Sequence, residues 1–267
     1  MSYLTNLKMG AFIPIDSPIH RLDPRFKIVS TLILLTFLFL VGSPYRLIPY
    51  LIFIIVLFYL SKVSFYMLLK GIKPILFLLI FAFIFQIFFT PGKVLIKLGF
   101  LSITEEGLNS GVLISFRLLL LVFLTNLLTF TTSPVEITNG IEELLKFLRF
   151  AKVPSHEIAM TMSIALRFIP TLFEEADRIM KAQMARGAEF GVGGFVKRIK
   201  SYIPLVIPLF VGVFRKAEEL AIAMETRCYR GDIGRTRMKK LKLKRLDYIG
   251  ILVLAVFLLA NSVWEWR

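Results

Sequence analysis

The sequence contains very few of the side chains that build disulfides and metal sites. Among its 267 residues there is one cysteine, Cys228, and there are two histidines, His20 and His156, which lie far apart in the chain. One thiol excludes an internal disulfide, and two distant histidines form no cluster with metal-ligand spacing. We therefore expect neither a resident metal nor a cofactor.

The sequence also lacks the motifs of ATP-hydrolysing and membrane-embedded enzymes. No Gly-x-x-x-x-Gly-Lys-Ser/Thr run is present, so the chain has no such loop to hold ATP phosphates. A membrane-embedded enzyme needs clustered His, Asp, Glu or nucleophilic side chains, and the sequence offers no such constellation. Cys228 has no histidine close by in sequence, which favours a packing role. We expect a protein that is not itself an enzyme.

Apolar residues, in contrast, are abundant. They make up 57% of the chain, with 26 phenylalanines and a mean hydropathy of +0.75, whereas a soluble domain is about 45–50% apolar. This composition predicts an all-α integral membrane protein with about five transmembrane helices and a cytoplasmic helical domain. The five candidate spans are Phe26–Gly42, Leu47–Leu60, Ile75–Thr90, Gly111–Phe130 and Tyr248–Trp264.

The basic residues predict the orientation of these spans. Lys and Arg number 33 against 18 acidic residues, and 21 of the 33 lie between residues 131 and 247. Because basic residues favour the cytoplasmic side, we expect the N-terminus and residues 131–247 in the cytoplasm. The chain then divides into 1–130, with a leader and four spans, 131–247, and 248–267, the last span. We expect no cleavable signal peptide, because no small-residue cleavage site follows the first apolar run.

Two shorter apolar runs, Ile158–Phe173 and Tyr202–Phe214, could be mistaken for spans. If both crossed the membrane, the chain would have seven spans, and a basic segment between them would lie outside, against the charge rule. The second run has 13 residues, about 20 Å of helix, and includes two prolines. We interpret both runs as apolar faces of cytoplasmic helices at or against the membrane. Residues expected to be buried there by a partner are Met160, Ile164, Ile203 and Val206.

Residues 131–247 predict three helices joined by short breaks. Thr132-Ser133-Pro134 is a typical helix start, with a cap before a proline, and this helix should reach about Phe150. A second helix should begin at Pro154-Ser155 and end near Gly187. A third should follow the glycine-rich break at 191–194 and reach about Tyr229.

Two charged features near the spans favour structural roles. The basic run 239–245 directly precedes the last span, so contact with anionic membrane lipid explains it better than nucleic-acid binding. Arg117 lies inside the fourth span, where a charge is costly unless it is paired or faces protein. Since no span offers an obvious acidic partner, we interpret Arg117 as a structural residue.

A weak internal repeat with a shift of 41 residues links the second and third helices. Each arginine could simply offset the negative end of its helix dipole. The duplicated spacing instead favours a paired binding device, because a guanidinium fork binds carboxylates or helix-end carbonyls. The arginines lie in the triplets Ala185-Arg186-Gly187 and Thr226-Arg227-Cys228. The repeat matches Phe173, Ala176, Asp177, Ala182 and Arg186 to Phe214, Ala217, Glu218, Ala223 and Arg227.

These features resemble the transmembrane T component of energy-coupling factor (ECF) transporters, which are bacterial and archaeal ABC-type importers. The leader His20-Arg21-Leu22-Asp23-Pro24-Arg25-Phe26-Lys27 is similar to the family's N-terminal signature. The two arginine triplets resemble its paired coupling motifs, although Thr226 and Cys228 depart from the usual Ala and Gly. The resemblance covers nearly the whole chain.

The resemblance implies a non-catalytic subunit of an ATP-driven importer of vitamins or metal ions in the plasma membrane. It implies two ABC-type ATPase subunits docked on residues 185–187 and 226–228. It also implies a membrane-embedded substrate-binding (S) subunit on the apolar faces around Met160, Ile164, Ile203 and Val206. The alternative is a self-contained secondary transporter, which would normally show two similar halves with broken helices in the membrane. Here the repeat lies in the cytoplasmic helices instead.

Overall fold

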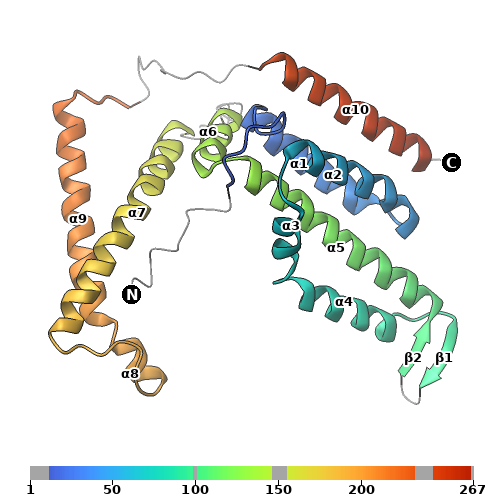
Figure 1. Cartoon of the computed structure of the whole chain (residues 1–267), viewed down its shortest axis with the longest axis horizontal. Helices are drawn as coiled ribbons and strands as arrows, with labels where there is room; N and C mark the ends of the chain where they lie inside the picture. Colours follow the sequence, from blue (N-terminus) through green and yellow to red (C-terminus); the bar gives the residue numbers. More distant parts are fainter. Residues whose placement is uncertain (1–11, 99–100, 146–154, 232–242, 266–267) are drawn as a thin grey trace. The chain divides into compact units, whose positions relative to one another are not determined.

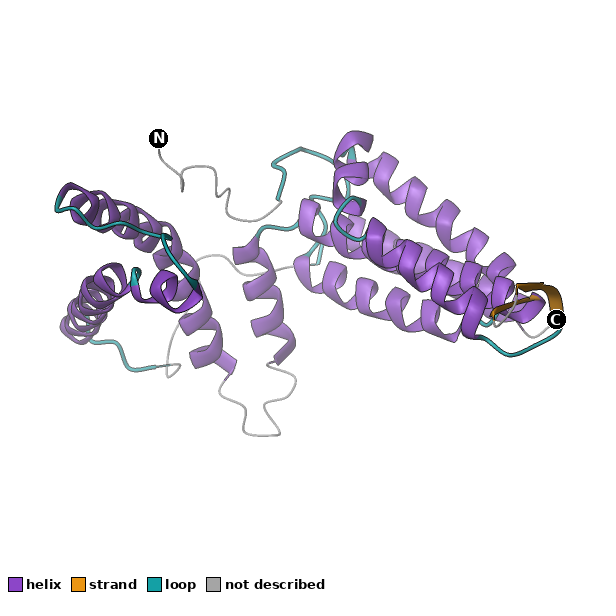
Figure 2. Cartoon of the chain, turned by 90° about the horizontal axis from the view of Figure 1, so that it is seen from below, coloured by secondary structure: helices purple, strands orange, loops and turns teal. Residues whose placement is uncertain are grey.

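The computed structural model describes residues 12–98, 101–145, 155–231 and 243–265, and nearly all of its regular structure is helical (Figures 1 and 2). The chain forms two compact units. The membrane unit comprises the described residues within Gly10–Gly140 and Lys239–Arg267, and the α7–α9 unit comprises those within Ile141–Met238. The elements are α1 (Pro24–Leu40), a 3-10 helix (Pro44–Leu47), α2 (Ile48–Ser61), α3 (Phe65–Ile72), α4 (Leu76–Phe89), β1 (Val94–Leu98), β2 (Leu101–Thr104), α5 (Glu105–Thr131), α6 (Pro134–Leu145), α7 (Ser155–Ala185), α8 (Phe195–Lys200), α9 (Ile203–Thr226) and α10 (Arg245–Glu265).

The membrane unit is apolar both inside and outside. Its core is built from α1, α2, α5 and α10, with side chains such as Leu38, Ile54 and Leu120 fully buried. The outward faces of these helices and of α4 also carry large apolar residues; Phe77 is 79% exposed. Such a large apolar surface is unfavourable in water but is compatible with the hydrocarbon core of a membrane. The prediction of an all-α membrane protein is therefore confirmed.

All five predicted spans fall on helices of the membrane unit. Among the described residues, three helical stretches are long and apolar enough to cross a membrane: Pro44–Ser61, Glu105–Thr131 and Arg245–Ser262. Residues 66–89 qualify as a fourth only if α3 and α4, bent by 55°, count together. The remaining candidate, α1, has 17 residues, so a total of five stays a prediction. The runs on α7 and α9 are not among the qualifying stretches.

Three features of the membrane unit were not predicted from the sequence. The segment between the second and third spans contains α3, and an antiparallel hairpin of β1 and β2 precedes α5, with Lys97 opposite Ser102. In addition, α5 begins at Glu105, earlier than its apolar run. Thr104 caps it, because its Oγ1 accepts a bond of 3.0 Å from the Gly107 N–H and donates one of 2.8 Å to Thr90 O.

Helix α6 begins as the sequence predicts. Ser133 and Glu136 form a reciprocal capping box: the Ser133 N–H donates to Glu136 Oε2 at 3.1 Å, and the Glu136 N–H donates to Ser133 Oγ at 3.3 Å. Pro134 occupies the first helical position, where its missing N–H costs nothing. The structure describes α6 to Leu145, so the predicted end near Phe150 lies outside the described residues.

The third predicted helix is in fact two helices. Helix α7 runs from Ser155 to Ala185 as predicted, but a single helix from the glycine break to Tyr229 is wrong. Helix α8 stops at Lys200, and α9 starts at Ile203 with Pro204 in its first turn. Proline has no N–H with which to continue the hydrogen bonds of the preceding helix, so α8 ends and a new helix starts.

Candidate functional site

Helices α7 and α9 lie side by side and run in opposite directions (Figure 1). Two contacts set their alignment: Tyr229 Oη donates to Met160 Sδ at 2.9 Å, and Lys216 Nζ lies 3.6 Å from Glu175 Oε2. In this alignment Arg186 lies opposite the start of α9, about 23 residues from Arg227. At 1.5 Å per residue the two arginines are roughly 35 Å apart along the pair. The repeat therefore places one arginine at each end.

The ends of α7 and α9 have the same backbone hydrogen bonds at the same shift of 41 residues. In α7, the N–H groups of Gly187 and Ala188 donate to the carbonyls of Met184 and Gln183. In α9, the N–H groups of Cys228 and Tyr229 donate to the carbonyls of Glu225 and Met224. Each set is a Schellman motif, and each arginine is the C-cap residue. The weak sequence repeat is thus a repeat of structure.

Both arginine side chains are exposed. In the part of the chain that the structure describes, no carboxylate lies in ion-pair range of Arg186 or Arg227. Neither guanidinium is used in holding the α7–α9 unit together, so each can accept an acidic partner. Thr226 Oγ1 donates to Ala223 O at 3.1 Å and so stays on its own helix. Ala185 and Cys228 are exposed beside the arginines.

The first half of α9 carries an exposed apolar stripe. Its members follow helical spacing and are about half exposed, whereas Leu205, Leu209 and Val213 on another face are half-buried. A continuous exposed apolar surface of six side chains has to be covered by a partner protein or by lipid. We call them the α9 stripe: Ile203, Val206, Ile207, Phe210, Val211 and Phe214.

The four predicted contact residues do not share one face. Ile203 and Val206 belong to the α9 stripe. Met160 and Ile164 are half-buried, and Met160 accepts the hydrogen bond from Tyr229. Met160 therefore contributes to pairing α7 with α9.

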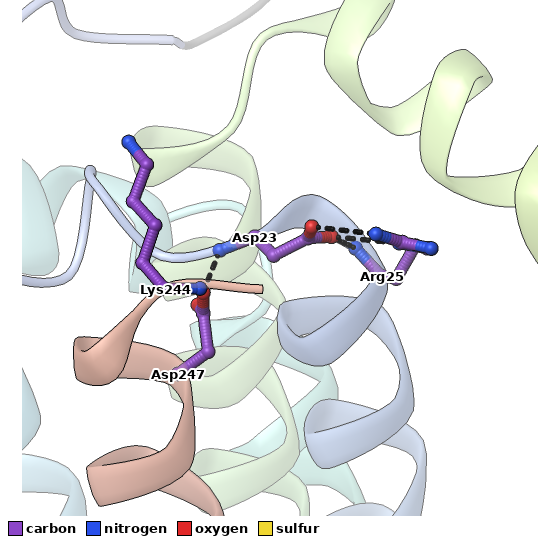
Figure 3. A network of polar contacts seen from close by, with 4 residues as sticks. All are labelled: Asp23, Arg25, Lys244 and Asp247. Carbon is purple, nitrogen blue, oxygen red and sulfur yellow. Dashed lines mark hydrogen bonds and ion pairs between the residues drawn. The ribbon is translucent and has the colours of Figure 1, made fainter. Parts of the chain in front are cut away.

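A polar network at the start of α1 was not predicted from the sequence. Asp247 Oδ1 accepts the N–H of Asp23 at 2.7 Å, and its Oδ2 accepts the N–H of Lys244 at 2.6 Å (Figure 3). Asp23 caps α1 through Arg25 N and pairs with the Arg25 guanidinium at 3.0 Å. Burial raises the pKa of Asp23, but the hydrogen bonds from Arg25 outweigh it and leave the pKa below its usual value. Residues 224 positions apart thus join the leader to α10.

The same leader binds the end of α5 through Lys27. The buried Lys27 Nζ donates to Thr131 O at 2.8 Å and to His20 O at 3.1 Å. His20 Nε2 lies 3.0 Å from Ile13 O, and its Nδ1 lies 2.7 Å from Ser17 Oγ, an arrangement that suits a neutral ring donating from Nε2. Burial lowers the pKa of His20. In the sequence, only the leader signature pointed to these residues, and it does not reveal which groups they contact.

The structure supports a packing role for Arg117. Its Nη2 donates to Val41 O, the C-cap of α1, and its guanidinium lies 5.7 Å from the centre of the Phe39 ring. A cation at a helix C-terminus offsets the dipole. Within the described residues there is no group of three or more His, Cys, Asp or Glu side chains that could hold a metal ion.

An apolar helical unit, joined in sequence to a pair of helices that end in exposed arginines, defines an all-α membrane protein. Comparison with known proteins agrees. Residues 16–239 match the family model described as cobalt transport protein, CbiQ, and the chain belongs to this family of ECF-type transmembrane transport components.

Relatives cover almost the full length of the chain. Three proteins described as energy-coupling factor transporter transmembrane protein EcfT are similar to it. The protein from Ruminiclostridium cellulolyticum is 47% identical over 255 residues, 96% of each chain. That from Thermosediminibacter oceani is 45% identical over 98% of this chain and 100% of its own. That from Bacillus subtilis is 44% identical over 96% of this chain and 98% of its own.

Proposed function

We propose that this chain is the T subunit of an ECF-type importer and passes the movement of two ATPase subunits to a membrane-embedded S subunit. The observation that carries the proposal is the duplicated helix end: two exposed arginines, in identical Schellman motifs, at opposite ends of one helix pair. The names of the relatives support the transport role. The chain itself hydrolyses no ATP in this proposal, and the N-terminus and the α7–α9 unit face the cytoplasm.

In this proposal each arginine end holds one ATPase subunit. A separation of roughly 35 Å along the helix pair leaves room for two proteins rather than one, by the helical rise. Because Arg186 and Arg227 are exposed and make no ion pair with a described residue, each guanidinium is available for a bidentate carboxylate on its ATPase. Two helix ends with the same backbone geometry suit two ATPase subunits of the same kind.

The α9 stripe holds the S subunit in the same proposal. Its side chains are apolar and exposed over three helical turns, so they need an apolar partner. When the two ATPases move relative to each other, the arginine ends move with them and change the orientation of the helix pair. The stripe then carries the S subunit along, which changes its orientation in the membrane and releases substrate. Vitamins and metal ions are the substrate classes we propose.

Arginine substitutions test the ATPase contacts. Losing one member of a desolvated charge pair at an interface costs about 2–5 kcal/mol. We therefore expect Arg186→Ala and Arg227→Ala each to weaken co-purification of the ATPases at least tenfold, and the double variant to abolish it. Lysine should rescue poorly, because it lacks the guanidinium fork.

Two exposed arginines on the same helices serve as matched controls. Arg178→Ala on α7 and Arg215→Ala on α9 remove the same charge away from the helix ends and should leave ATPase binding within twofold. Full ATPase binding by the double variant would show that Arg186 and Arg227 only cap their helices.

A further inference from the structure

The membrane unit contains an apolar pocket that the proposed function does not use. The pocket has a volume of about 220 Å³ and lies among the leader, α1, α2, α5 and α10. Gly250 brings α10 close to α1, since a Cβ there would lie 2.8 Å from Cε1 of Phe26. Beside this contact the surrounding side chains leave the space unfilled. Lining residues include Thr31, Leu34, Leu57, Leu127, Val253 and Leu254.

Water is a poor occupant of this pocket. A buried water needs two to four polar partners, and three of the four polar side chains in the lining, those of Lys27, Ser30 and Thr131, are hydrogen-bonded elsewhere. Lys27 Nζ donates to two carbonyls, Ser30 Oγ donates to Lys27 O at 3.0 Å, and Thr131 Oγ1 donates to Leu127 O at 2.7 Å. An apolar cavity of about 150 Å³ stays dry and takes up benzene. The pocket therefore suits an apolar guest, and acyl chains are the apolar molecules around it.

Two exposed basic side chains lie at the start of α10, next to the pocket. Lys244 and Arg245 are exposed and directly precede Leu246, which lines the pocket. Asp247 binds the backbone N–H of Lys244, while the Lys244 side chain extends away from that carboxylate (Figure 3). Neither side chain makes an ion pair with a described residue. The two cations suit a lipid phosphate, and the adjacent apolar pocket suits the acyl chain of the same lipid.

We propose that this pocket binds one acyl chain of an anionic phospholipid, whose phosphate is held by Lys244 and Arg245. The site is independent of ATPase or S-subunit binding and goes beyond the proposed function. In the proposed topology the lipid comes from the inner leaflet. A lipid chain here fills the space between α10 and the other helices, so it fixes where the last helix lies.

A photoactivatable lipid tests the pocket. The full chain is reconstituted in vesicles that contain phosphatidylglycerol with a diazirine on its acyl chain, and the labelled peptides are mapped by mass spectrometry. Label should concentrate on the lining residues of α1 and α10. Val253→Trp fills the pocket and should reduce labelling at these residues at least fivefold. Val256→Trp, an exposed position on α10 that does not line the pocket, should change it less than twofold.

A second filling variant and a charge pair complete the test. Thr31→Phe fills the pocket from α1 and should act as Val253→Trp does, with normal elution as the check on folding. Lys244→Gln and Arg245→Gln should each lower labelling by phosphatidylglycerol about fivefold. They should lower labelling by a phosphatidylcholine probe less than twofold, because its choline cation offsets the charge of its phosphate. Lys73→Gln is the charge control. Label spread evenly over α10, or unchanged in both filled variants, would overturn the proposal, and equal use of the two lipids would overturn its charge component.

Discussion

Cys228 has a backbone conformation that favours glycine. Its φ angle is +54°, and the equivalent residue at the end of α7 is Gly187, with a φ of +86°. A side chain in the left-handed region costs about 1–2 kcal/mol. The end of α9 keeps this geometry despite the cost, so the shared feature of the two triplets is the turn that presents the arginine.

The glycine positions predict opposite effects of one substitution. Gly187 and Gly212 both have no atom within 4 Å of an added Cβ, but only Gly187 has a positive φ. We expect Gly187→Ala to destabilise the last turn of α7 by about 1 kcal/mol, and Gly212→Ala to stabilise α9 by about 0.5–1 kcal/mol. Cys228→Gly should slow amide hydrogen exchange at the end of α9, because glycine adopts a positive φ without the cost of a side chain.

Amide hydrogen exchange of the purified protein measures these effects locally. Faster exchange is expected in the last turn of α7 for Gly187→Ala, and slower exchange in α9 for the other two variants. If the two alanine variants changed exchange in the same direction, the backbone strain described here would not control these helix ends.

Individual residues differ in how far the sequence alone could place them. The repeat identified Arg186 and Arg227 correctly as equivalent helix-end residues, because helix ends carry local signals such as Gly187 after α7 and Gly231 beyond α9. The bond between Asp23 and Asp247 joins residues 224 positions apart. No local signal specifies such a pair, so only the packed helices reveal it.

At the scale of elements, α9 has two apolar faces with different uses. Leu205 and Leu209 are half-buried, whereas Val206 and Phe210 in the α9 stripe are exposed. The helix therefore has more apolar surface than its own unit covers. This surplus is what a contact with a second protein requires.

The two faces predict separable phenotypes. A charge placed in an apolar contact costs a few kcal/mol unless solvent reaches it. Val206→Asp should leave ATPase co-purification intact and lower recovery of the S subunit at least tenfold. Leu209→Asp, on the half-buried face, should weaken the α7–α9 unit and reduce both. Recovery of the S subunit unchanged in Val206→Asp would show that the α9 stripe does not bind it.

Element boundaries were predictable where the chain carries a strong local signal. The cap residue before Pro134 placed the start of α6, and the apolar runs placed most of α2 and α5. The break before α9 was missed although Pro204 marks it, because the apolar pattern continues on both sides. The hairpin was missed because β1 and β2 have five and four residues, too few for a clear alternation.

At the scale of the whole molecule, the distribution of basic residues predicts a cytoplasmic α7–α9 unit. Gly194 suits a labelling test, because it has a φ of −65° and no atom within 4 Å of an added Cβ. In a Cys228→Ser background, Gly194→Cys should resist a membrane-impermeant thiol reagent added to intact cells. Tyr45→Cys, an exposed position in the predicted outer loop, should react. Ready labelling at Gly194 would favour seven spans.

Cross-linking at the two helix ends tests whether each arginine end binds one ATPase subunit. A photoreactive amino acid replaces Ala185 or Thr226, each next to its arginine, in cells that produce the whole transporter, and Tyr45 serves as the distant control. We predict that each helix-end position gives one adduct with the mass of an ATPase subunit, lost when the neighbouring arginine is changed to alanine, and that Tyr45 gives none. The absence of ATPase adducts at both ends, or an equal yield from Tyr45, would contradict the account.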